Sequence, residues 1–166
     1  MRVNILDARP FGLIPADEVG YKRGATYALM LMRINEGCTS ATSMCKVAIV
    51  DDDASGLLAM GRLLLAAGFA VTGFDSAEGF LADPLRYSFA CLLVDIHLPE
   101  MSGLELQRHL QAEGSRVPLI FITARDYPAL RAEATQGGCV GFFHKTVPGA
   151  FIIRALRGAT STNGKT

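Results

Sequence analysis

From Met44 onward, short apolar runs alternate with amphipathic stretches, and this alternation is the sequence feature that most constrains the fold. Five such units follow one another between Met44 and residue 158. Apolar runs without polar alternation are typical of parallel strands buried on both faces, and the stretches between them have the spacing of helices that pack on a sheet. The pattern therefore predicts an α/β fold built on a doubly wound parallel sheet.

The predicted strands are short, apolar and separated by helix signals. They are KVAIV from Lys46, the segment around Val71, FACLLV before Asp95, PLIFIT ending at Thr123, and CVGFFH before Lys145. Gly68 is placed to end the first helix, and Ser76 to begin the second. Ser102 and Glu105 have the spacing of a capping box in front of a third helix. These signals place a helix after each of the first three strands.

The chain divides into segments of different composition. Residues 1–43 contain scattered Gly and Pro and no motif, and we predict an N-terminal extension that is poorly ordered or weakly helical. Residues 44–158 are predicted to form one domain, which suits a chain of 166 residues. The small polar residues 159–166 are predicted to be a disordered tail.

Composition excludes several classes of function. The sixteen Lys and Arg residues balance sixteen Asp and Glu residues, so no overall field attracts nucleic acid or an anionic membrane. The apolar run 27–32 is too short to span a bilayer, and a cytoplasmic location is expected. The four cysteines are far apart with no CxxC pair, which argues against zinc and for reduced thiols that serve packing. They are Cys38, Cys45, Cys91 and Cys139.

Polar groups follow four of the predicted strands, and they point to a phosphate chemistry. They are Asp51–Asp53, Asp95, Thr123 and Lys145. Singly, each has an ordinary structural explanation as a helix cap, a satisfied hydroxyl or a solvated amine. Together they would meet at the carboxyl edge of the sheet, where clustered carboxylates require a cation such as Mg²⁺. An aspartate there can attack a phosphoryl group while metal and ammonium stabilise the charge.

Four motifs resemble those of the receiver domains of two-component response regulators. IVDDD, LLVDIHLPEMSGLEL, IFITA and GFFHK occur in the family's order between Lys46 and Arg157. The sequence around Asp95 is most similar to that of receivers that usually precede a LuxR-type helix-turn-helix output domain. No output domain is recognisable after it in this sequence. The resemblance implies a flavodoxin-like (βα)5 sheet of strand order 2-1-3-4-5.

The resemblance also implies a function. Such a chain takes a phosphoryl group from a sensor histidine kinase onto an aspartate, with Mg²⁺ as cofactor, and passes the signal to a downstream protein partner. It is not an enzyme, because it assists only its own phosphorylation and dephosphorylation. Direct binding to nucleic acid and association with a membrane are not expected.

The family motifs assign roles to the acidic residues of this sequence. Asp95 matches the phosphoacceptor. Asp51 and Asp52 match the acidic pair, with Asp52 the more direct magnesium ligand and Asp51 acting largely through water. Asp95 and the backbone carbonyl of His97 complete the implied ligand set. The imidazole of His97 is not implied as a ligand.

The motifs likewise imply a switch and one departure from the family. Thr123 matches the hydroxyl that turns toward the phosphoryl group, Phe142 the aromatic residue that turns inward with it, and Lys145 the ammonium that binds the phosphoryl group. Receivers usually place Pro directly after this Lys, commonly with a cis peptide, whereas Thr146 stands here. We predict a trans peptide bond that displaces Lys145 from the pocket.

Two other interpretations fit parts of the sequence. A degenerate receiver could serve purely as a protein-interaction module, if Thr146 has disabled the site through Lys145. The segment IVDDDAS also resembles the DxD motif of haloacid-dehalogenase-like phosphatases, with Asp51 as nucleophile and Asp53 as acid/base. The chain lacks the later acidic pair of those enzymes, and their chemistry leaves the motif around Asp95 unexplained.

Overall fold

The computed structural model describes residues 2–3, 44–125 and 127–162. Its strands are β1 (Arg2–Val3), β2 (Lys46–Val50), β3 (Ala70–Phe74), β4 (Cys91–Asp95), β5 (Leu119–Thr123) and β6 (Gly141–His144). Its helices are α2 (Ala54–Ala66), α3 (Ala77–Leu81), the 3-10 helix η1 (Arg86–Ser88), α4 (Gly103–Ala112), α5 (Pro128–Gln136) and α6 (Gly149–Thr162). Strands and helices alternate along the chain from Lys46, as predicted.

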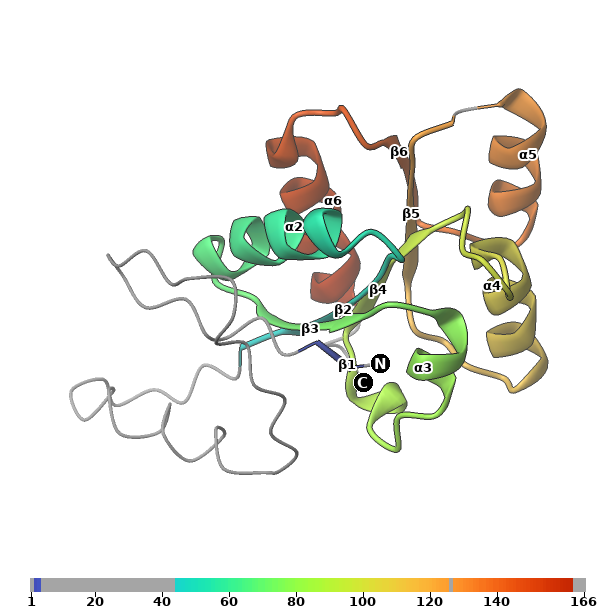
Figure 1. Ribbon diagram of the computed structural model, residues 1–166, viewed down its shortest axis with the longest axis horizontal. Coiled ribbons are helices and arrows are strands. Elements are labelled where there is room, and N and C mark those ends of the chain that lie inside the picture. Colours follow the sequence, from blue (N-terminus) through green and yellow to red (C-terminus); the bar gives the residue numbers. More distant parts are fainter. Residues whose placement is uncertain (1, 4–43, 126, 163–166) are drawn as a thin grey trace. The chain divides into compact units, whose positions relative to one another are not determined.

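The strands form one sheet of order β1-β3-β2-β4-β5-β6 (Figure 1). The five strands from β2 onward are parallel to one another, and their order is the predicted 2-1-3-4-5. The flavodoxin-like fold class is therefore confirmed. In such a sheet the strand order reverses beside the first strand, which opens a crevice at the carboxyl ends of the strands.

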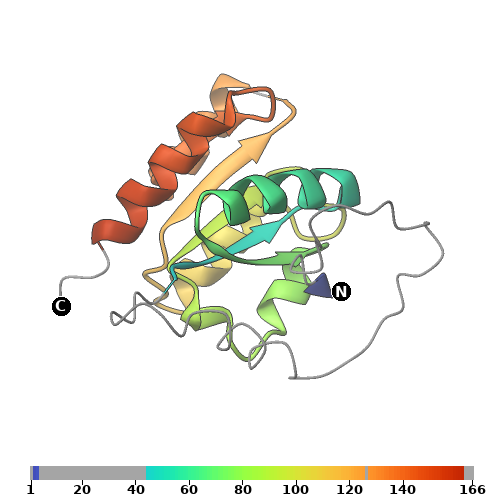
Figure 2. The same ribbon diagram turned by 90° about the vertical axis from the view of Figure 1, so that its left-hand side faces the viewer.

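Helices cover both faces of the sheet, with a separate hydrophobic core on each (Figures 1 and 2). Helices α2 and α6 pack on one face, where their buried residues meet alternate strand residues. This core includes Leu57, Leu64, Ile152 and Leu156 with Val47, Ile49, Leu93 and Ile122. Helices α3, α4 and α5 cover the other face, with Phe80, Leu106, Leu110 and Ala134 against Val50, Phe74, Val94 and Phe121. Because both faces are covered, the central strands are apolar throughout.

The predicted helix ends are confirmed. Ser76 accepts a hydrogen bond from Gly79 N at 3.3 Å and begins α3. Ser102 and Glu105 form the capping box of α4, in which Glu105 Oε2 accepts from Ser102 N at 2.9 Å. Gly68, just past the end of α2, has a φ of +91°, a conformation that an L side chain would disfavour.

Two predictions about the ends of the chain need correction. Residues 2–3 form β1, which pairs antiparallel with the edge strand β3, so the sheet has a strand before Met44 that the sequence did not indicate. The prediction of a disordered tail from residue 159 is wrong for residues 159–162, because α6 continues to Thr162. Ala159 is buried there and ties the extra turn to the core, and the Thr160 hydroxyl donates to Leu156 O at 2.9 Å. The rest of the predicted N-terminal extension, residues 4–43, lies outside the described residues.

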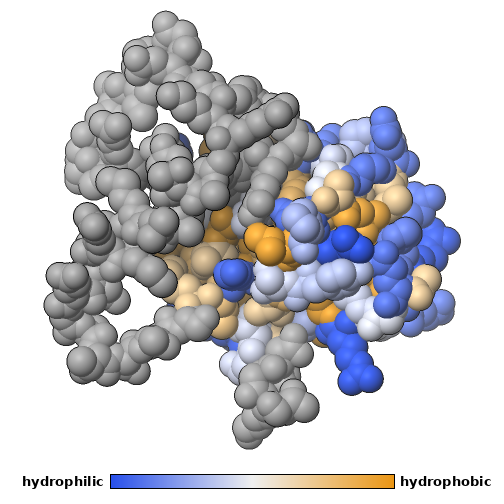
Figure 3. Space-filling view, turned by 90° about the horizontal axis from the view of Figure 1, so that it is seen from below, coloured by the Kyte–Doolittle hydropathy of each residue, from blue (hydrophilic) through white to orange (hydrophobic). Residues whose placement is uncertain are grey.

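The outer faces of α4 and α5 are mostly polar, whereas α2 and α6 expose Leu58 and Phe151. The surface on the side of α4 and α5 is largely hydrophilic in the space-filling view (Figure 3). No helix in the described part of the chain has both the length and the apolar character needed to cross a membrane. Cys45, Cys91 and Cys139 are free thiols, and burial raises the pKa of Cys91 to about 12. Cys38 lies outside the described residues.

Candidate functional site

The register of the sheet brings the predicted site residues to one edge. Asp95 and Thr123 are the last residues of β4 and β5, and Asp51 and Lys145 directly follow β2 and β6. The aligned pairs at this edge are Val50 with Val94, Asp95 with Ile122, and Thr123 with His144. Residues that are up to 94 positions apart in sequence therefore share one pocket.

Three carboxylates form the acidic side of the pocket. Asp51 and Asp95 are 3% and 4% exposed, whereas Asp52 faces solvent. One oxygen from each of the three lies within 4.8 Å of the other two. Burial raises the pKa of the Asp51 carboxyl above its ordinary value of 3.8, against the opposing effect of the hydrogen bonds that it accepts. Three hard oxygen donors at this spacing fit a small dication such as Mg²⁺.

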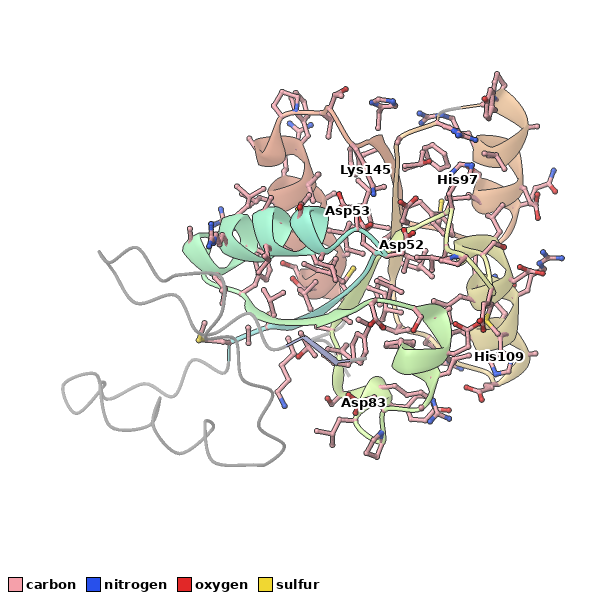
Figure 4. The ribbon with its side chains drawn as sticks, in the orientation of Figure 1. Asp52, Asp53, Asp83, His97, His109 and Lys145 are labelled. Atoms are coloured by element: carbon pink, nitrogen blue, oxygen red, sulfur yellow. The ribbon has the colours of Figure 1, made fainter. Side chains whose placement is uncertain are left out.

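Lys145 occupies the centre of the pocket. Its Nζ lies 2.8 Å from Asp51 Oδ2 and 2.7 Å from Asp95 Oδ2. Burial acts to lower the pKa of the ammonium, but the hydrogen bonds and charges of the two carboxylates outweigh it and raise that pKa above 10.5. Lys145, Asp52 and His97 come from three loops and lie at the same end of the sheet (Figure 4).

The prediction about the residue after Lys145 is half right. The peptide bond between Lys145 and Thr146 is trans. The ammonium is nevertheless not displaced, since it contacts both Asp51 and Asp95. The flexible four-carbon stem of Lys reaches the carboxylates from the trans backbone. The basis for a site disabled by Thr146 is thereby removed.

Asp53 serves the helix rather than the pocket. Its Oδ1 accepts from Ser55 N at 3.0 Å, which makes Asp53 the N-cap of α2. Asp51 in turn accepts from Asp53 N at 3.0 Å and from Lys145. The acid/base role that a phosphatase would assign to Asp53 thus competes with a helix cap, and the DxD interpretation loses support.

The backbone around Asp95 fixes the orientation of its carboxylate. Oδ1 accepts from His97 N at 3.0 Å, while Oδ2 contacts Lys145. The first residue of α4, Gly103, donates its N–H to Ile96 O at 3.0 Å and packs directly on this turn. A Cβ at Gly103 would lie 2.3 Å from the backbone oxygen of Asp95. Only glycine permits so close an approach.

The Thr123 hydroxyl is fully buried and fully engaged. It donates to Arg125 O at 3.0 Å, accepts from Arg125 N at 3.1 Å, and lies 3.1 Å from His97 Nδ1. A hydroxyl has one proton and two lone pairs, so these contacts use its full capacity, with His97 Nδ1 as the donor. Any movement of Thr123 toward Asp95 must break some of them.

Phe142 lies on β6 between a ring and a cation. Its ring centroid is 6.3 Å from that of Phe121, and the Arg131 guanidinium carbon lies 4.4 Å above its face. Arg131 belongs to α5, so the contact joins α5 to β6 beside the pocket. A guanidinium over an aromatic face is attracted by the ring quadrupole. The predicted switch aromatic is thus half-buried and held from both sides.

Sequence reasoning missed three residues that shape the site. Gly103 was part of a quoted motif but received no role, and a Gly at the first position of a capped helix was the available signal. Arg131 had no signal, because its contact with Phe142 depends on how α5 packs. His144 had none either, although it directly precedes Lys145.

Comparison with known proteins identifies the family. Response regulator protein TodT of Pseudomonas putida is 38% identical over 111 residues, which are 67% of this chain and 49% of that protein. Transcriptional regulatory protein FixJ of Bradyrhizobium diazoefficiens is 35% identical over 104 residues, covering 63% of this chain and 51% of that one. The chain thus spans about half the length of the curated relatives it matches. One of these names is that of a response regulator and the other that of a transcriptional regulatory protein, in agreement with the predicted resemblance.

Solved structures agree with this relationship. The crystal structure of FixJ-N has a TM-score of 0.66 and 33% identity, and the match covers 72% of this chain and 96% of that one. Response regulator StyR has a TM-score of 0.68 and 33% identity, with 74% and 62% covered. Residues 47–157 match the response regulator receiver domain itself. The chain therefore belongs to the response regulator receiver domain family of two-component systems.

Proposed function

We propose that this chain is a phosphoacceptor of a two-component phosphorelay, with Asp95 as the residue that takes the phosphoryl group from a sensor histidine kinase. One observation carries the proposal: the buried Asp95 carboxylate is fixed between His97 N and the Lys145 ammonium, beside two further carboxylates. This is a nucleophile with a cation already in place, at the edge of the sheet where receivers carry out phosphotransfer.

The transfer is a displacement at phosphorus. An Asp95 carboxylate oxygen forms a bond to phosphorus as the P–N bond to the donor imidazole breaks, and the imidazole leaves with the electron pair and takes up a proton. The Lys145 ammonium lies close enough to Asp95, at 2.7 Å, to neutralise charge on the transferred oxygens. The product is an aspartyl phosphate.

The carboxylate cluster fits a magnesium ion in this reaction. Asp51, Asp52, Asp95 and the backbone carbonyl of His97 would hold it, with Asp52 exposed and open to solvent. Bound there, Mg²⁺ supplies charge neutralisation and orientation of the phosphoryl oxygens. Lys145 contacts Asp51 and Asp95 and also neutralises part of their charge.

The conformational switch would involve Thr123 and Phe142. The Thr123 hydroxyl exchanges its contacts with Arg125 and His97 for the phosphoryl group, and Phe142 then turns inward toward the space that it leaves. The contacts of Arg131 and Phe121 with Phe142 oppose this movement in the unphosphorylated state. Phosphorylation thereby biases an element with two arrangements.

Intact-protein mass spectrometry with acetyl phosphate and Mg²⁺ tests the proposal. The full chain should gain one labile phosphoryl group, and Asp95→Asn should gain none while retaining its circular dichroism spectrum, because the amide is near-isosteric but not nucleophilic. Asp53→Asn is the matched control and should label normally, since Asn is also a good helix cap. Full labelling of Asp95→Asn would refute the assignment.

A further inference from the structure

The imidazole of His144 bridges the two loops that carry the switch threonine and the phosphoryl-binding lysine. Its Nε2 lies 2.9 Å from Ala124 O, in the loop that follows β5. Its Nδ1 lies 2.8 Å from Thr146 Oγ1 and 3.3 Å from Thr146 N, in the loop that follows β6. One side chain thus spans the loops that begin after Thr123 and after His144 itself.

The partners of the ring indicate which of its two nitrogens carries a hydrogen. The backbone N–H of Thr146 can only donate, so Nδ1 is an acceptor, and the Thr146 hydroxyl donates to it as well. The carbonyl of Ala124 can only accept, so Nε2 carries the proton. The Nε2–H tautomer matches these contacts, with the lone pair of Nδ1 shared by two donors, and the ring is held at both ends.

These contacts enclose Lys145. Its backbone N donates to Thr123 O at 2.8 Å, and Val147 N donates to His144 O at 2.9 Å. The ring adds a side-chain bond from the residue before Lys145 to the residue after it. The turn is thereby closed around Lys145, whose ammonium extends into the pocket toward Asp51 and Asp95.

We propose that His144 is a positioning residue for phosphoryl transfer, which, together with Thr146, holds the loop after β6 in the conformation that places the Lys145 ammonium against Asp95. The inference rests on the proposed function of Asp95 as acceptor. The contact with Ala124 joins this loop to the backbone next to Thr123. The same ring therefore fixes the position of Lys145 relative to the Thr123 hydroxyl.

Loss of the His144 contacts should lower the phosphorylation rate without lowering Mg²⁺ affinity, whereas a general loss of structure would lower both. Loosening the loop removes a preorganised cation from the transferred oxygens, so phosphorylation slows. Mg²⁺ affinity does not fall, because Lys145 and the metal neutralise the same carboxylates, and a less firmly held ammonium competes less. If His144 only stabilised the fold, its removal would lower both the phosphorylation rate and the Mg²⁺ affinity.

The test measures rates of phosphorylation of the full chain by acetyl phosphate at saturating Mg²⁺, and Mg²⁺ affinity by calorimetric titration. His144→Ala should lower the rate about tenfold, within the range that misplacement of a catalytic group costs, with equal or tighter Mg²⁺ binding. His109→Ala is the control, since His109 lies on α4 away from the pocket (Figure 4) and its side chain is 47% exposed. Its rate should equal that of the wild type.

Two conservative variants separate the two ends of the ring. An Asn side chain places its oxygen near the position of Nδ1, and a Gln side chain places its amide near the position of Nε2. His144→Asn should recover more of the rate than His144→Gln, because closure of the turn around Lys145 depends on the contact with Thr146. Equal rates for Asn, Gln and Ala would overturn this assignment.

The remaining outcomes distinguish the proposed function of Asp95 from the positioning role of His144. A wild-type chain that takes up no phosphoryl group refutes the proposed function itself. A wild-type chain that labels, with His144→Ala labelling equally fast or losing Mg²⁺ affinity in parallel with rate, refutes the positioning role alone. Should His144→Ala fail to fold, Thr146→Val removes only the hydroxyl contact. It should slow phosphorylation, and an unchanged rate would refute the inference.

Discussion

Replacing Lys145 by Met should destabilise the metal-free protein and make it more responsive to Mg²⁺. The substitution keeps an unbranched side chain that is one atom shorter, but it leaves Asp51 and Asp95 buried without their cation, which lies 2.8 and 2.7 Å away in the wild type. Removing one partner of a fully buried pair costs about 3–5 kcal/mol. The Lys145 side chain is 28% exposed, so solvent screens part of this, and we expect a loss of about 2 kcal/mol at neutral pH.

Thermal unfolding with and without Mg²⁺ measures both effects. At roughly 4 °C per kcal/mol for a domain of this size, Lys145→Met should lower Tm by about 8 °C without metal. Saturation of a site at a hundred times its Kd adds about 2.7 kcal/mol, and the gain should be larger in the variant because no ammonium has to be displaced. Mg²⁺ should therefore reduce the difference in Tm between the wild type and Lys145→Met.

The control is Lys46→Met, an exposed lysine at the opposite end of β2. It should change stability by less than about 0.5 kcal/mol. A Lys145→Met variant as stable as wild type without metal would refute the role of Lys145 as counter-ion. A difference in Tm that widens with Mg²⁺ would show that lysine and metal do not share these carboxylates.

Three further predictions concern the pocket and its supports. Asp51→Asn should raise the free energy of unfolding at neutral pH, measured by chemical denaturation. Burial raises the pKa of the Asp51 carboxyl in the folded protein, so the stability of the wild type falls as pH rises through that folded pKa. The gain from Asp51→Asn should therefore vanish below about pH 3.8, where the carboxyl is protonated in both the folded and the unfolded state. In a magnesium titration Asp52→Ala should weaken binding more than Asp53→Ala, and equal losses would contradict the ligand set. Gly103→Ala should lower Tm by the equivalent of about 1–3 kcal/mol, because its Cβ meets a backbone oxygen at 2.3 Å. Gly158→Ala, also helical but with nothing within 4 Å of the added Cβ, should instead gain about 0.5–1 kcal/mol.

The sheet and the positions of the site residues followed from sequence because both depend on a strong local pattern. Strands buried on both faces must be apolar, so the first polar residue after each run marks the edge of the sheet. That rule locates Asp51, Asp95 and Thr123, and it places Lys145 one residue beyond His144, the first polar residue of the last run. The parallel order then brought them together.

The ends of the chain were harder to predict because their structure depends on tertiary contacts. A two-residue strand such as β1 (Arg2–Val3) has no periodicity and forms only because the edge of β3 is available. The last turn of α6 consists of small polar residues that suggest disorder. It is helical because Ala159 is buried against the sheet, and the hydroxyls of Thr160 and Ser161 are satisfied by carbonyls four residues earlier.

The hydrogen bonds that orient the site residues could not be predicted from the sequence either. The bonds of His97 to Thr123 and of His144 to Ala124 and Thr146 depend on loop paths and rotamers, for which no spacing rule exists. The same applies to Lys145, which reaches Asp95 from a trans peptide although the missing Pro suggested displacement. Loop geometry decided each of these cases.

The central claim, that Asp95 is the phosphoacceptor, is tested most directly by locating the phosphoryl group. Borohydride reduces an aspartyl phosphate to homoserine, which peptide mass spectrometry places at a single position. After incubation with acetyl phosphate and Mg²⁺, the account predicts homoserine at position 95 and nowhere else. Homoserine at position 51, where a phosphatase of the DxD type would carry its nucleophile, or at no aspartate at all, would contradict it.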